Sequence, residues 1–538
     1  MIARLDKCIV AAGAILMLAS QADAQAGRRS GEPTLKRADS AYLSGDRDKA
    51  RALYAEVLTQ DSSQSRAVFQ LAQLEESNTR ALALYRRYIA LEPDDPWGHM
   101  AEGDLLARMG RWADALVAYD GAHAITPDER DVAIGRARLL ERAGRSYEAA
   151  DELAAWTTAH ADDGEAWDLL GRSRMRAGRP QGAASAFEQA VRRNVRGAGG
   201  RLDAARAASA PVVAPDVSSL GDSDGNRTTR FGALVELMPM DGLRIGAGGQ
   251  RLTIANDVEQ AEGLNLLARV AARPSPQVNI TVQGGASRYL MPVAGTGTPL
   301  NGPGTPMGGP GAPMAGPPQT RTVTWVPLHA AARLRARVPG RSSTIDLRLE
   351  HAPIAFTPQL LANRVSRSEA RAMVEVPVGA IRVRGGGRFG HLTATGEPSN
   401  GRTGVEGAVV YPLGDRLQPS IQYRAVGFQR ESAAGYFAPR RAETAEGGLY
   451  FENADDGSLS LSADLGAGVQ RVTMHDGSAG GWTRVWRAWS QAALAMGPSR
   501  AWYVEVEAYD SPFALDGVAT TGAWRFLSVS SGVRWAIR

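Results

Sequence analysis

The sequence predicts an α + β protein of two domains, an N-terminal α-solenoid of helix hairpins and a C-terminal antiparallel transmembrane β-barrel of about 16 strands. Three observations support this. The apolar period is helical in the first part of the 538 residues and changes to strict alternation after about residue 212. After the first 24 residues, no stretch of the chain is apolar for long enough to form a transmembrane helix. In Ser343–Glu350 polar and charged side chains alternate with Ile345, Leu347 and Leu349, so one strand face is wet and the other apolar.

The first 24 residues have the features of a secretory signal peptide. Basic residues precede an apolar run from Ile9 to Ala19, and Ala22-Asp23-Ala24 offers a cleavage site of small residues. The only cysteine of the chain, Cys8, lies inside this segment, so the mature chain has no disulfide and no cysteine-based metal site. We expect residues 1–24 to be removed and the mature protein to leave the cytoplasm.

Residues 33–207 are rich in alanine and helical in period. They also repeat with the spacing W-x2-L-G followed by A-x3-F-x2-A, which is typical of tetratricopeptide units. The motif positions are Gly103, Ala115, Tyr119, Trp167, Leu170, Gly171, Ala183, Phe187 and Ala190. We expect about five repeats in which these residues form the core, because the motif positions are packing positions. The region resembles the tetratricopeptide-repeat family, which implies protein binding through polar residues of the concave helix faces.

We assign residues 208–538 to the barrel, because turn residues punctuate them at short, regular intervals. The expected strands are 212–220, 227–238, 243–255, 263–272, 278–290, 322–338, 343–353, 366–377, 380–393, 402–412, 417–428, 443–453, 457–473, 482–496, 501–510 and 521–537. Tight turns alternate with longer connections, among them Met291–Thr320 and Thr395–Gly401. Outer-membrane barrels have short periplasmic turns and long outside loops. This order places both termini and the repeats in the periplasm of a Gram-negative bacterium.

The polar faces of the strands are expected to line a wet lumen. The residues assigned to it are Arg333, Arg335, Asp346, Arg348, Glu350, Glu369, Arg371, Glu375, Arg382, Arg384, Glu446, Glu505 and Glu507. Guanidinium groups pair with carboxylates in a planar geometry and also donate hydrogen bonds to sugar hydroxyls. Two interpretations stay open: an ion-pair lattice that braces the wall, and a hydrophilic conduit for a polar polymer.

Aromatic residues near strand ends or on the lipid-facing parity predict an interfacial girdle against outer-membrane lipid, with sugar stacking as the alternative. They are Trp325, Trp482, Trp486, Trp502, Trp524, Trp535 and Tyr411. The longest connection, Met291–Thr320, is almost all Gly, Pro, Thr and Ala, and we expect it to be mobile. It either folds over the pore mouth or decorates the surface.

We find no catalytic constellation. Gly221–Gly225 matches G-x-S-x-G, but strands flank it where a nucleophile elbow needs a following helix. Gly385–Gly390 matches a dinucleotide loop by letter, yet no helix follows it. The histidines form no metal-binding cluster, and the charges of both signs are interspersed, which argues against a nucleic-acid arm. We therefore expect no enzyme activity, no cofactor, no metal and no nucleic-acid partner.

The layout of a signal peptide, helical repeats and a barrel is similar to that of exopolysaccharide export proteins, such as the outer-membrane subunit of cellulose synthase and the poly-N-acetylglucosamine porin. Gly435-Tyr436-Phe437-Ala438-Pro439 resembles a segment of the cellulose-type barrel. The resemblance implies that the repeats dock periplasmic or inner-membrane synthase proteins and that a polysaccharide passes through the lumen. The alternative is an outer-membrane receptor or scaffold that resembles phage-adsorption proteins, with a plugged barrel and repeats that bind protein.

Overall fold

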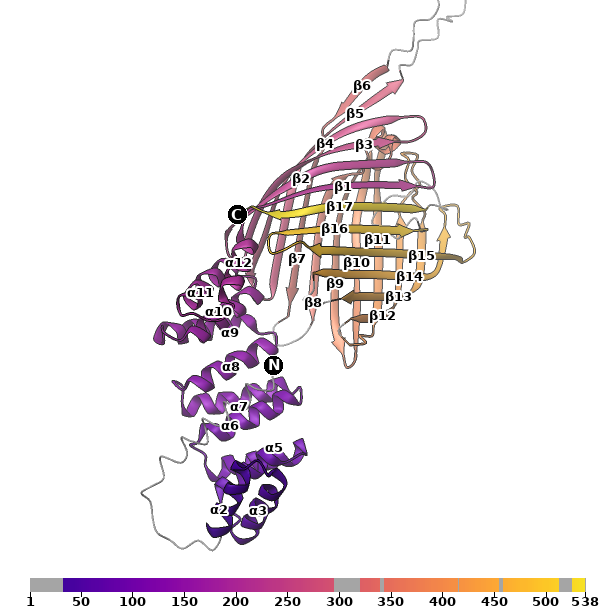
Figure 1. Ribbon diagram of the computed structural model, residues 1–538. Coiled ribbons are helices and arrows are strands. Elements are labelled where there is room, and N and C mark those ends of the chain that lie inside the picture. Colours follow the sequence, from indigo (N-terminus) through magenta and orange to yellow (C-terminus); the bar gives the residue numbers. More distant parts are fainter. Residues whose placement is uncertain are drawn as a thin grey trace, which may run out of the picture. The chain divides into compact units, whose positions relative to one another are not determined.

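The computed structural model describes residues 32–294, 320–338, 343–414, 416–453, 458–511 and 525–537. Over these residues, helices come first and antiparallel strands follow (Figure 1). The chain divides into two compact units, Met1–Ala166 and Trp167–Arg538, so the last helices belong to the unit that contains the strands. The expected signal segment, residues 1–24, lies outside the described residues.

Within the described part, eleven helices precede the first strand. They are α2 (Glu32–Leu43), α3 (Arg47–Gln60), α4 (Ser65–Leu74), α5 (Asn78–Leu91), α6 (Pro96–Arg108), α7 (Trp112–Ile125), α8 (Arg130–Arg142), α9 (Ser146–Ala159), α10 (Gly164–Arg176), α11 (Pro180–Arg192) and α12 (Ala198–Ser209). Helices adjacent in sequence pack against each other, as in α6 with α7. The sequence sets several of the ends: Asp46 and Asp95 cap the first turns of α3 and α6, and Gly110 takes a left-handed φ of 75° just after α6.

The strands form one closed antiparallel sheet. They are β1 (Val212–Asp222), β2 (Arg227–Met240), β3 (Leu243–Ala255), β4 (Gln260–Ser275), β5 (Val278–Ala294), β6 (Thr320–Trp325), β7 (Leu328–Arg337), β8 (Thr344–Pro353), β9 (Ser366–Val378), β10 (Ile381–Ala394), β11 (Glu397–Val410), β12 (Leu417–Phe428), β13 (Arg441–Asn453), β14 (Leu459–Thr473), β15 (Thr483–Ala495), β16 (Arg500–Tyr509) and β17 (Phe526–Ala536). Strands that are neighbours in sequence pair with each other, except β6 and β7, and β1 pairs with both β2 and β17, which closes the ring.

The barrel has 16 strands around its circumference, as predicted, because β6 and β7 occupy one position in the ring. Both pair with β5 in one unbroken register, from Tyr289↔Trp325 to Ala286↔Leu328. The break between them falls at Pro327, which has no backbone N–H to give to the ladder.

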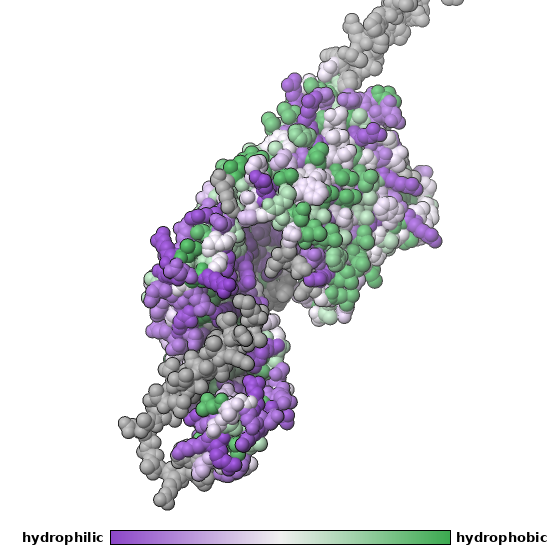
Figure 2. Space-filling model, viewed as in Figure 1, coloured by the Kyte–Doolittle hydropathy of each residue, from purple (hydrophilic) through white to green (hydrophobic). Residues whose placement is uncertain are grey.

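The register sorts the barrel side chains onto two faces. Arg333, Arg348, Arg371 and Arg388 are successive cross-strand partners and therefore share the inner face. Large apolar side chains occupy the outer face, where Ile421 is 75% exposed. Figure 2 shows hydrophobic residues gathered over the outside of the barrel. This distribution fits an outer-membrane barrel, whose apolar band faces lipid.

No helix in the described part of the chain is both long enough and apolar enough to cross a bilayer.

The two ends of the barrel differ. One end, here called the turn end, holds the start of β1 and short connections such as Asp241–Gly242 between β2 and β3. The opposite end, the loop end, holds the longer connections 354–365, 429–440 and 474–482. The first of these contains a short helix, α13 (Pro358–Ala362), that the sequence did not predict. Most of the expected connection Met291–Thr320 lies outside the described residues.

One expected long connection, Thr395–Gly401, is wrong. β10 runs on to Ala394 and β11 begins at Glu397, so only two residues join them. The Pro, Asn and Gly that suggested a loop lie in a strand. Asn400 is held there because its side-chain amide donates to Arg430 O at 2.8 Å and accepts from Arg430 N–H at 3.1 Å.

Candidate functional site

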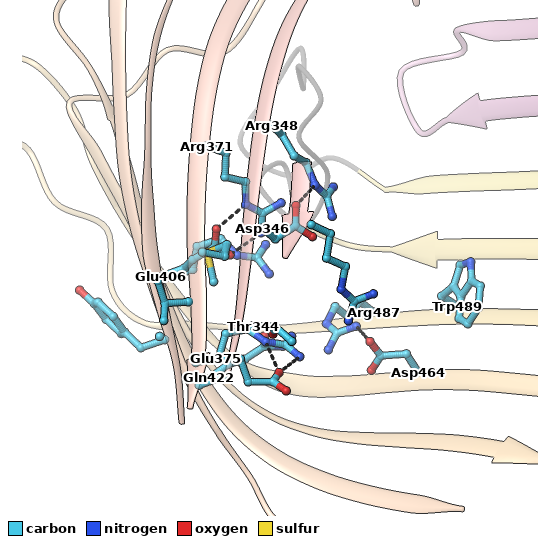
Figure 3. Close-up of a pocket in the computed structure, with 18 of the residues that line it drawn as sticks. Thr344, Asp346, Arg348, Arg371, Glu375, Glu406, Gln422, Asp464, Arg487 and Trp489 are labelled. Atoms are coloured by element: carbon cyan, nitrogen blue, oxygen red, sulfur yellow. Dashed lines mark hydrogen bonds and ion pairs between the residues drawn. The ribbon is translucent and has the colours of Figure 1, made fainter. Parts of the chain in front are cut away.

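A charged cavity of about 360 Å³ lies inside the barrel (Figure 3). The side chains that line it come from β7 to β16 and include Arg333, Arg335, Thr344, Asp346, Arg348, Arg371, Glu375, Arg384, Glu406, Arg424, Asp464, Arg487, Trp489 and Glu507. Strand alternation aims all of them inward, while their sequence neighbours face outward. The cavity is therefore a property of the strand register rather than of any one loop.

Asp346 is shared by two arginines. The Arg333 Nε atom donates to its Oδ1 atom at 3.1 Å, and the Arg348 Nε atom donates to the same oxygen at 3.2 Å. Arg348 also lies directly opposite Arg333 in the β7–β8 ladder. One carboxylate thus offsets part of the charge of two guanidinium groups that would otherwise repel each other.

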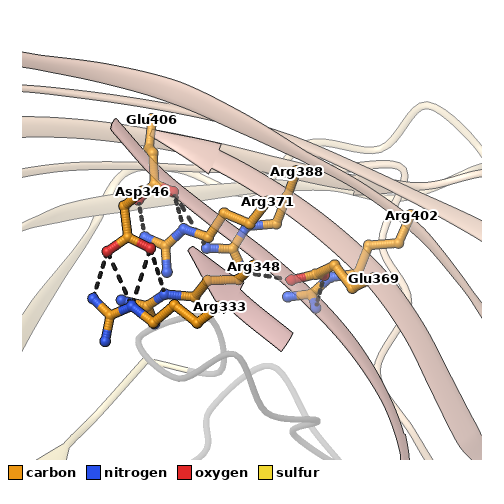
Figure 4. Close-up of polar contacts among 8 residues, drawn as sticks. All are labelled: Arg333, Asp346, Arg348, Glu369, Arg371, Arg388, Arg402 and Glu406. Atoms are coloured by element: carbon orange, nitrogen blue, oxygen red, sulfur yellow. Dashed lines mark hydrogen bonds and ion pairs between the residues drawn. The ribbon is translucent and has the colours of Figure 1, made fainter. Parts of the chain in front are cut away.

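A second group of ion pairs joins three strands, β9, β10 and β11 (Figure 4). Arg371 binds Glu406 through two parallel hydrogen bonds, of 2.6 Å from Nε and 2.7 Å from Nη2. Arg388 lies 3.7 Å from both Glu406 and Glu369, and Arg402 donates to Glu369 at 2.8 Å. The Arg388 and Arg402 side chains are almost fully buried. Charges removed from water in this way need their partners, because an uncompensated buried charge is strongly unfavourable.

The remaining expected lumen residues also lie on the inner face of the register. Their contacts are Arg384 with Glu375 (2.8 Å), Arg382 with Glu375 (3.9 Å), Arg487 with Glu446 (2.6 Å), Arg367 with Glu350 (2.8 Å) and Gln491 with Glu505 (3.4 Å). Glu507 lines the charged cavity. Arg335 also lines it but forms no ion pair with any described residue.

Sequence reasoning missed several lining residues, notably Glu406, Arg424, Arg487 and Trp489. Glu406 lies near Gly404, Gly407 and Ala408 of β11, where polar and apolar positions contrast weakly. Its parity with Arg402 was the signal that could have placed it inside. The inward position of Trp489 could also have been predicted, because Trp489 is two residues from Arg487 and so lies on the same face of the strand. Arg487 binds Asp464 at 2.8 Å.

Two connections of the loop end fold inward and form an apolar cluster, which we call the mouth cluster. Leu361 of α13 packs against Leu252, Ile254, Ala261, Tyr289 and Met291, and Leu360 packs against Val365, Leu392, Ala434, Tyr436 and Ala438. Both leucines are 0% exposed. Phe356 and Phe437 continue the cluster onto Leu220, Tyr509 and Phe526, which belong to β1, β16 and β17. The connection 354–365 starts from β8, so it reaches strands on the other side of the ring.

A second cavity, of about 580 Å³, lies below the mouth cluster. Its wall combines polar residues of β2 to β9 with the first residues of the connection 354–365. They include Arg230, Gln250, Asn265, Gln283, Ser287, Tyr289, His329, Glu350, Phe356 and Arg367. On this side the lumen therefore carries amide and hydroxyl groups beside apolar side chains, together with the ion pair of Arg367 and Glu350.

Five of the seven aromatic residues expected in a girdle are exposed. Trp482, Trp486, Trp502, Trp535 and Tyr411 are between 41% and 49% exposed. Trp325, in contrast, does not face lipid. It packs on Tyr289 with ring centroids 5.7 Å apart and lies beside the mouth cluster. The unbroken register across Pro327 gives Trp325 the inward parity of Arg333, which is why the expectation for this residue was wrong. Trp524 lies outside the described residues.

Most of the repeat motif residues pack in the core of the helical region, whereas Trp167 is half-buried. Ala115, Leu170, Ala183, Phe187 and Ala190 are at most 1% exposed, and Tyr119 is 3% exposed. Gly103 faces the Tyr119 ring so closely that a Cβ atom there would lie 2.5 Å from a ring carbon. The Tyr119 hydroxyl donates to Asp104 at 2.9 Å. Burial, together with the Asp104 carboxylate, raises the pKa of Tyr119 above its usual range.

The enzyme-like strings are barrel elements. Gly221–Gly225 covers the end of β1 and the turn to β2, and Gly385–Gly390 lies within β10. Among the described residues, no three His, Cys, Asp or Glu side chains are grouped so that they could hold a metal ion.

Residues 106–172 match the family model described as tetratricopeptide repeat. The solved structure of the MamA protein is 16% identical and covers 32% of this chain and 95% of its own, with a TM-score of 0.29. YrrB, a TPR protein with an unusual peptide-binding site, is 17% identical and covers 31% of this chain and 87% of its own, with a TM-score of 0.28. A thermophilic TPR protein of Thermus thermophilus, TTC0263, is 19% identical and covers 32% of this chain and 98% of its own, with a TM-score of 0.25.

The comparison with curated proteins gave no match. Tetratricopeptide repeats generally mediate binding between proteins. A helical repeat region of this type followed by a closed 16-strand antiparallel barrel fits an outer-membrane protein that carries protein-binding repeats.

Proposed function

We propose that this protein is a passive outer-membrane channel that exports a secreted polysaccharide. The observation that carries the proposal is the lumen: its two cavities are lined by guanidinium, carboxylate, amide and hydroxyl groups, which bind the hydroxyls of a sugar chain without holding it in one place. The chain contributes no catalytic step. Polymerisation elsewhere supplies the driving force.

The proposal assigns the helical repeats to the periplasm. There they dock periplasmic or inner-membrane proteins of the synthesis machinery, so that the growing polymer is delivered to the turn end of the barrel. The attachment of the repeats at the start of β1, which is the end with short connections, supports this orientation, because outer-membrane barrels keep their short turns on the periplasmic side.

The mouth cluster acts as the gate in this proposal. A polymer that enters at the turn end meets Phe356, Leu360 and Leu361 at the loop end, all packed against other parts of the barrel. The two connections, 354–365 and 429–440, must therefore swing outward for each export event. At rest, their apolar contacts keep the outer membrane sealed.

The same cluster favours a second candidate function. A barrel that stays plugged at its loop end is suited to a receptor or scaffold, in which the outside loops and the protein-binding repeats carry the function. In that case the polar lumen is only a braced wall, and the connections 354–365 and 429–440 never leave it.

Conductance of the purified protein in planar bilayers separates the two functions. For the channel we expect small, intermittent currents from the unchanged protein. A variant in which Gly-Ser linkers replace residues 355–364 and 430–439 should give large, steady currents. A variant in which the linker replaces only residues 296–318 is the control for removing a loop. If a further variant with all three segments replaced also stays closed, the conduit idea fails and the scaffold is favoured. Loss of extracellular polysaccharide in a deletion strain, restored by the gene, tests the cargo.

A further inference from the structure

We propose that the part of the lumen wall formed by β5 and β7 is a binding track for an acidic polysaccharide, so that the exported polymer carries carboxylate groups. The inference rests on the proposed function and adds the chemical class of the cargo. Two rows of side chains make up this acidic-sugar track. The arginine row is Arg333, Arg335 and Arg337 of β7, and the amide row is Asn279, Thr281 and Gln283 of β5.

The strand register places the two rows side by side. Arg335 is the cross-strand partner of Asn279, and Arg333 is the partner of Thr281. Neighbouring strands lie about 4.8 Å apart, and side chains on one face of a strand repeat about every 6.7 Å. The track therefore offers guanidinium donors along one line and uncharged amide and hydroxyl groups along the next.

Positive charge is in excess around the charged cavity, which the arginine row borders through Arg333 and Arg335: seven arginines and five carboxylates line it. Asp346 already accepts hydrogen bonds from Arg333 and Arg348. Arg335 and Arg337 have no ion pair with any described residue, and both are exposed to the lumen. At least two guanidinium groups of the track are thus open to a ligand.

The arrangement selects among polysaccharides by charge. A guanidinium group binds a carboxylate through two parallel charge-assisted hydrogen bonds, and amides bind the hydroxyls beside it. A polymer with acidic sugar residues satisfies both rows at once. A neutral glucan supplies no counter-charge to Arg335 and Arg337, and a polymer of amino sugars with free, protonated amines meets repulsion from them.

Calorimetric titration of the full-length protein in detergent micelles tests the track, with three oligosaccharides of six sugars as probes: oligogalacturonate (acidic), cellohexaose (neutral) and chitosan hexamer (cationic). We expect oligogalacturonate to bind at least about 10-fold more tightly than either of the others at low salt, and Arg335→Gln to lower that affinity by about 10-fold. Binding of cellohexaose should not change in the variant. Because the interaction is between charges, added salt should weaken binding of the acidic probe.

Arg534→Gln is the matched control. Arg534 lies near the end of β17, has inward parity and forms no ion pair with a described residue, but it is far from β7 around the ring. Its replacement removes the same charge at the same end of the barrel and should change the affinity for oligogalacturonate less than about 2-fold. The track would be overturned if cellohexaose bound as tightly as oligogalacturonate, or if chitosan hexamer bound more tightly than oligogalacturonate. It would also be overturned if Arg335→Gln and Arg534→Gln lost the same affinity for oligogalacturonate.

The titration and the conductance measurement fail independently. Binding in micelles needs no open pore. If the barrel binds oligogalacturonate but never conducts, the track is supported and the export function is rejected. If it conducts after loop replacement but binds no acidic probe, the channel is supported and the track is rejected. The Arg335→Gln variant should fold normally, because the side chain it replaces is exposed and has no ion pair with a described residue.

Discussion

The Asp241 carboxylate accepts a hydrogen bond of 2.8 Å from the backbone N–H of Gly182, which joins a turn of the barrel to the first turn of helix α11. Its other oxygen accepts the backbone N–H of Gln181 at 2.8 Å. The Gln181 side chain donates in turn to Met238 O at 2.7 Å. A carboxylate at a helix N-terminus satisfies free N–H groups and complements the helix dipole. The last helices are thus fastened to the turn end by the barrel itself.

Replacing Asp241 with Ala should loosen this junction. The change leaves two N–H groups of α11 without an acceptor, which costs about 1 kcal/mol. Hydrogen–deuterium exchange should show faster exchange at Gln181 and Gly182 and no change in the strands. Asp476→Ala is the control, because Asp476 accepts its hydrogen bonds from Ser478, in a turn at the loop end of the barrel. Equal protection of α11 in both variants would mean that the junction does not depend on Asp241.

Breaking the Arg371–Glu406 pair should destabilise the barrel. Arg371→Met removes the two short hydrogen bonds of Glu406 and leaves Arg388 at 3.7 Å, and we expect a loss of about 1–3 kcal/mol, since water in the lumen screens part of the charge. The double variant Arg371→Met/Glu406→Met should recover some of this loss, because neither member of the pair is left without the other. Urea unfolding in detergent measures both.

The exposed pair Arg251–Glu262 offers a comparison for that experiment. Its atoms are 3.3 Å apart and its side chains are 70% and 48% exposed, so Arg251→Gln should cost less than about 1 kcal/mol. A loss as large as that of Arg371→Met would show that burial of the lumen pairs is not what makes them matter.

Leu360→Ala and Leu361→Ala should each raise the open probability of the barrel in planar bilayers. Each change removes a fully buried side chain from the mouth cluster and weakens the packing of the connection 354–365 by about 2–4 kcal/mol. Leu413→Ala, at the turn end, is the control, because Leu413 is 49% exposed. Unchanged currents in all three variants would contradict a gate at the mouth cluster.

The strand positions and the inner face followed from the sequence because period-2 alternation is a local signal. Arg333, Arg335 and Arg337 alternate with Leu334 and Ala336, and the structure keeps that order. Glu406 was not predicted, because the polar–apolar alternation around it in β11 is weak. Even there, counting parity along β11 from Arg402 would have sufficed.

The mouth cluster could not be predicted in the same way, because its contacts join residues far apart in sequence. The Asn363 amide donates to Ala434 O, 71 residues later, at 2.9 Å, and the Thr228 hydroxyl donates to Phe356 O, 128 residues later, at 3.2 Å. Helix α13 exists because Leu360 and Leu361 find apolar partners on two different walls. Neither the length nor the composition of the loop contains that information.

Asp163→Asn should destabilise the helical repeats at neutral pH and not at low pH. Burial opposes ionisation of Asp163, but hydrogen bonds from Arg130 and from the Ala166 backbone N–H outweigh it and hold its pKa below the usual range. A carboxyl whose pKa falls on folding contributes stability above its unfolded pKa of about 3.9, and this is lost as the pH drops through the folded value.

We expect a difference of about 1 kcal/mol between the unchanged protein and Asp163→Asn at about pH 7, and almost none at about pH 2–3. Thermal unfolding of the helical signal by circular dichroism measures it. A difference that stays constant over this range would show that the loss in the variant comes from shape rather than charge.

Two helical glycines should respond in opposite ways to alanine. Gly103→Ala places a methyl group against the Tyr119 ring, at 2.5 Å, and should cost about 1–3 kcal/mol. At Gly200 of α12, a methyl group would meet no atom within 4 Å, so Gly200→Ala should be neutral or stabilise the helix by up to about 1 kcal/mol. Thermal unfolding compares the two, and a stabilising Gly103→Ala would contradict the close packing of α6 on Tyr119.

The seam between β1 and β17 has a consequence for how the protein is made. Asp222 pairs with Phe526 and Val212 pairs with Ala536, so the first strand of the barrel cannot complete its pairing before the last strand is present. The helices before β1 make their contacts with near neighbours and can form while the chain is still being delivered, whereas the ring closes only when nearly all of it is present. Until then the backbone N–H and C=O groups along one edge of β1 are unpaired, and such an edge is prone to pair with other chains. We therefore expect the unfinished barrel to need a chaperone until β1 and β17 have paired.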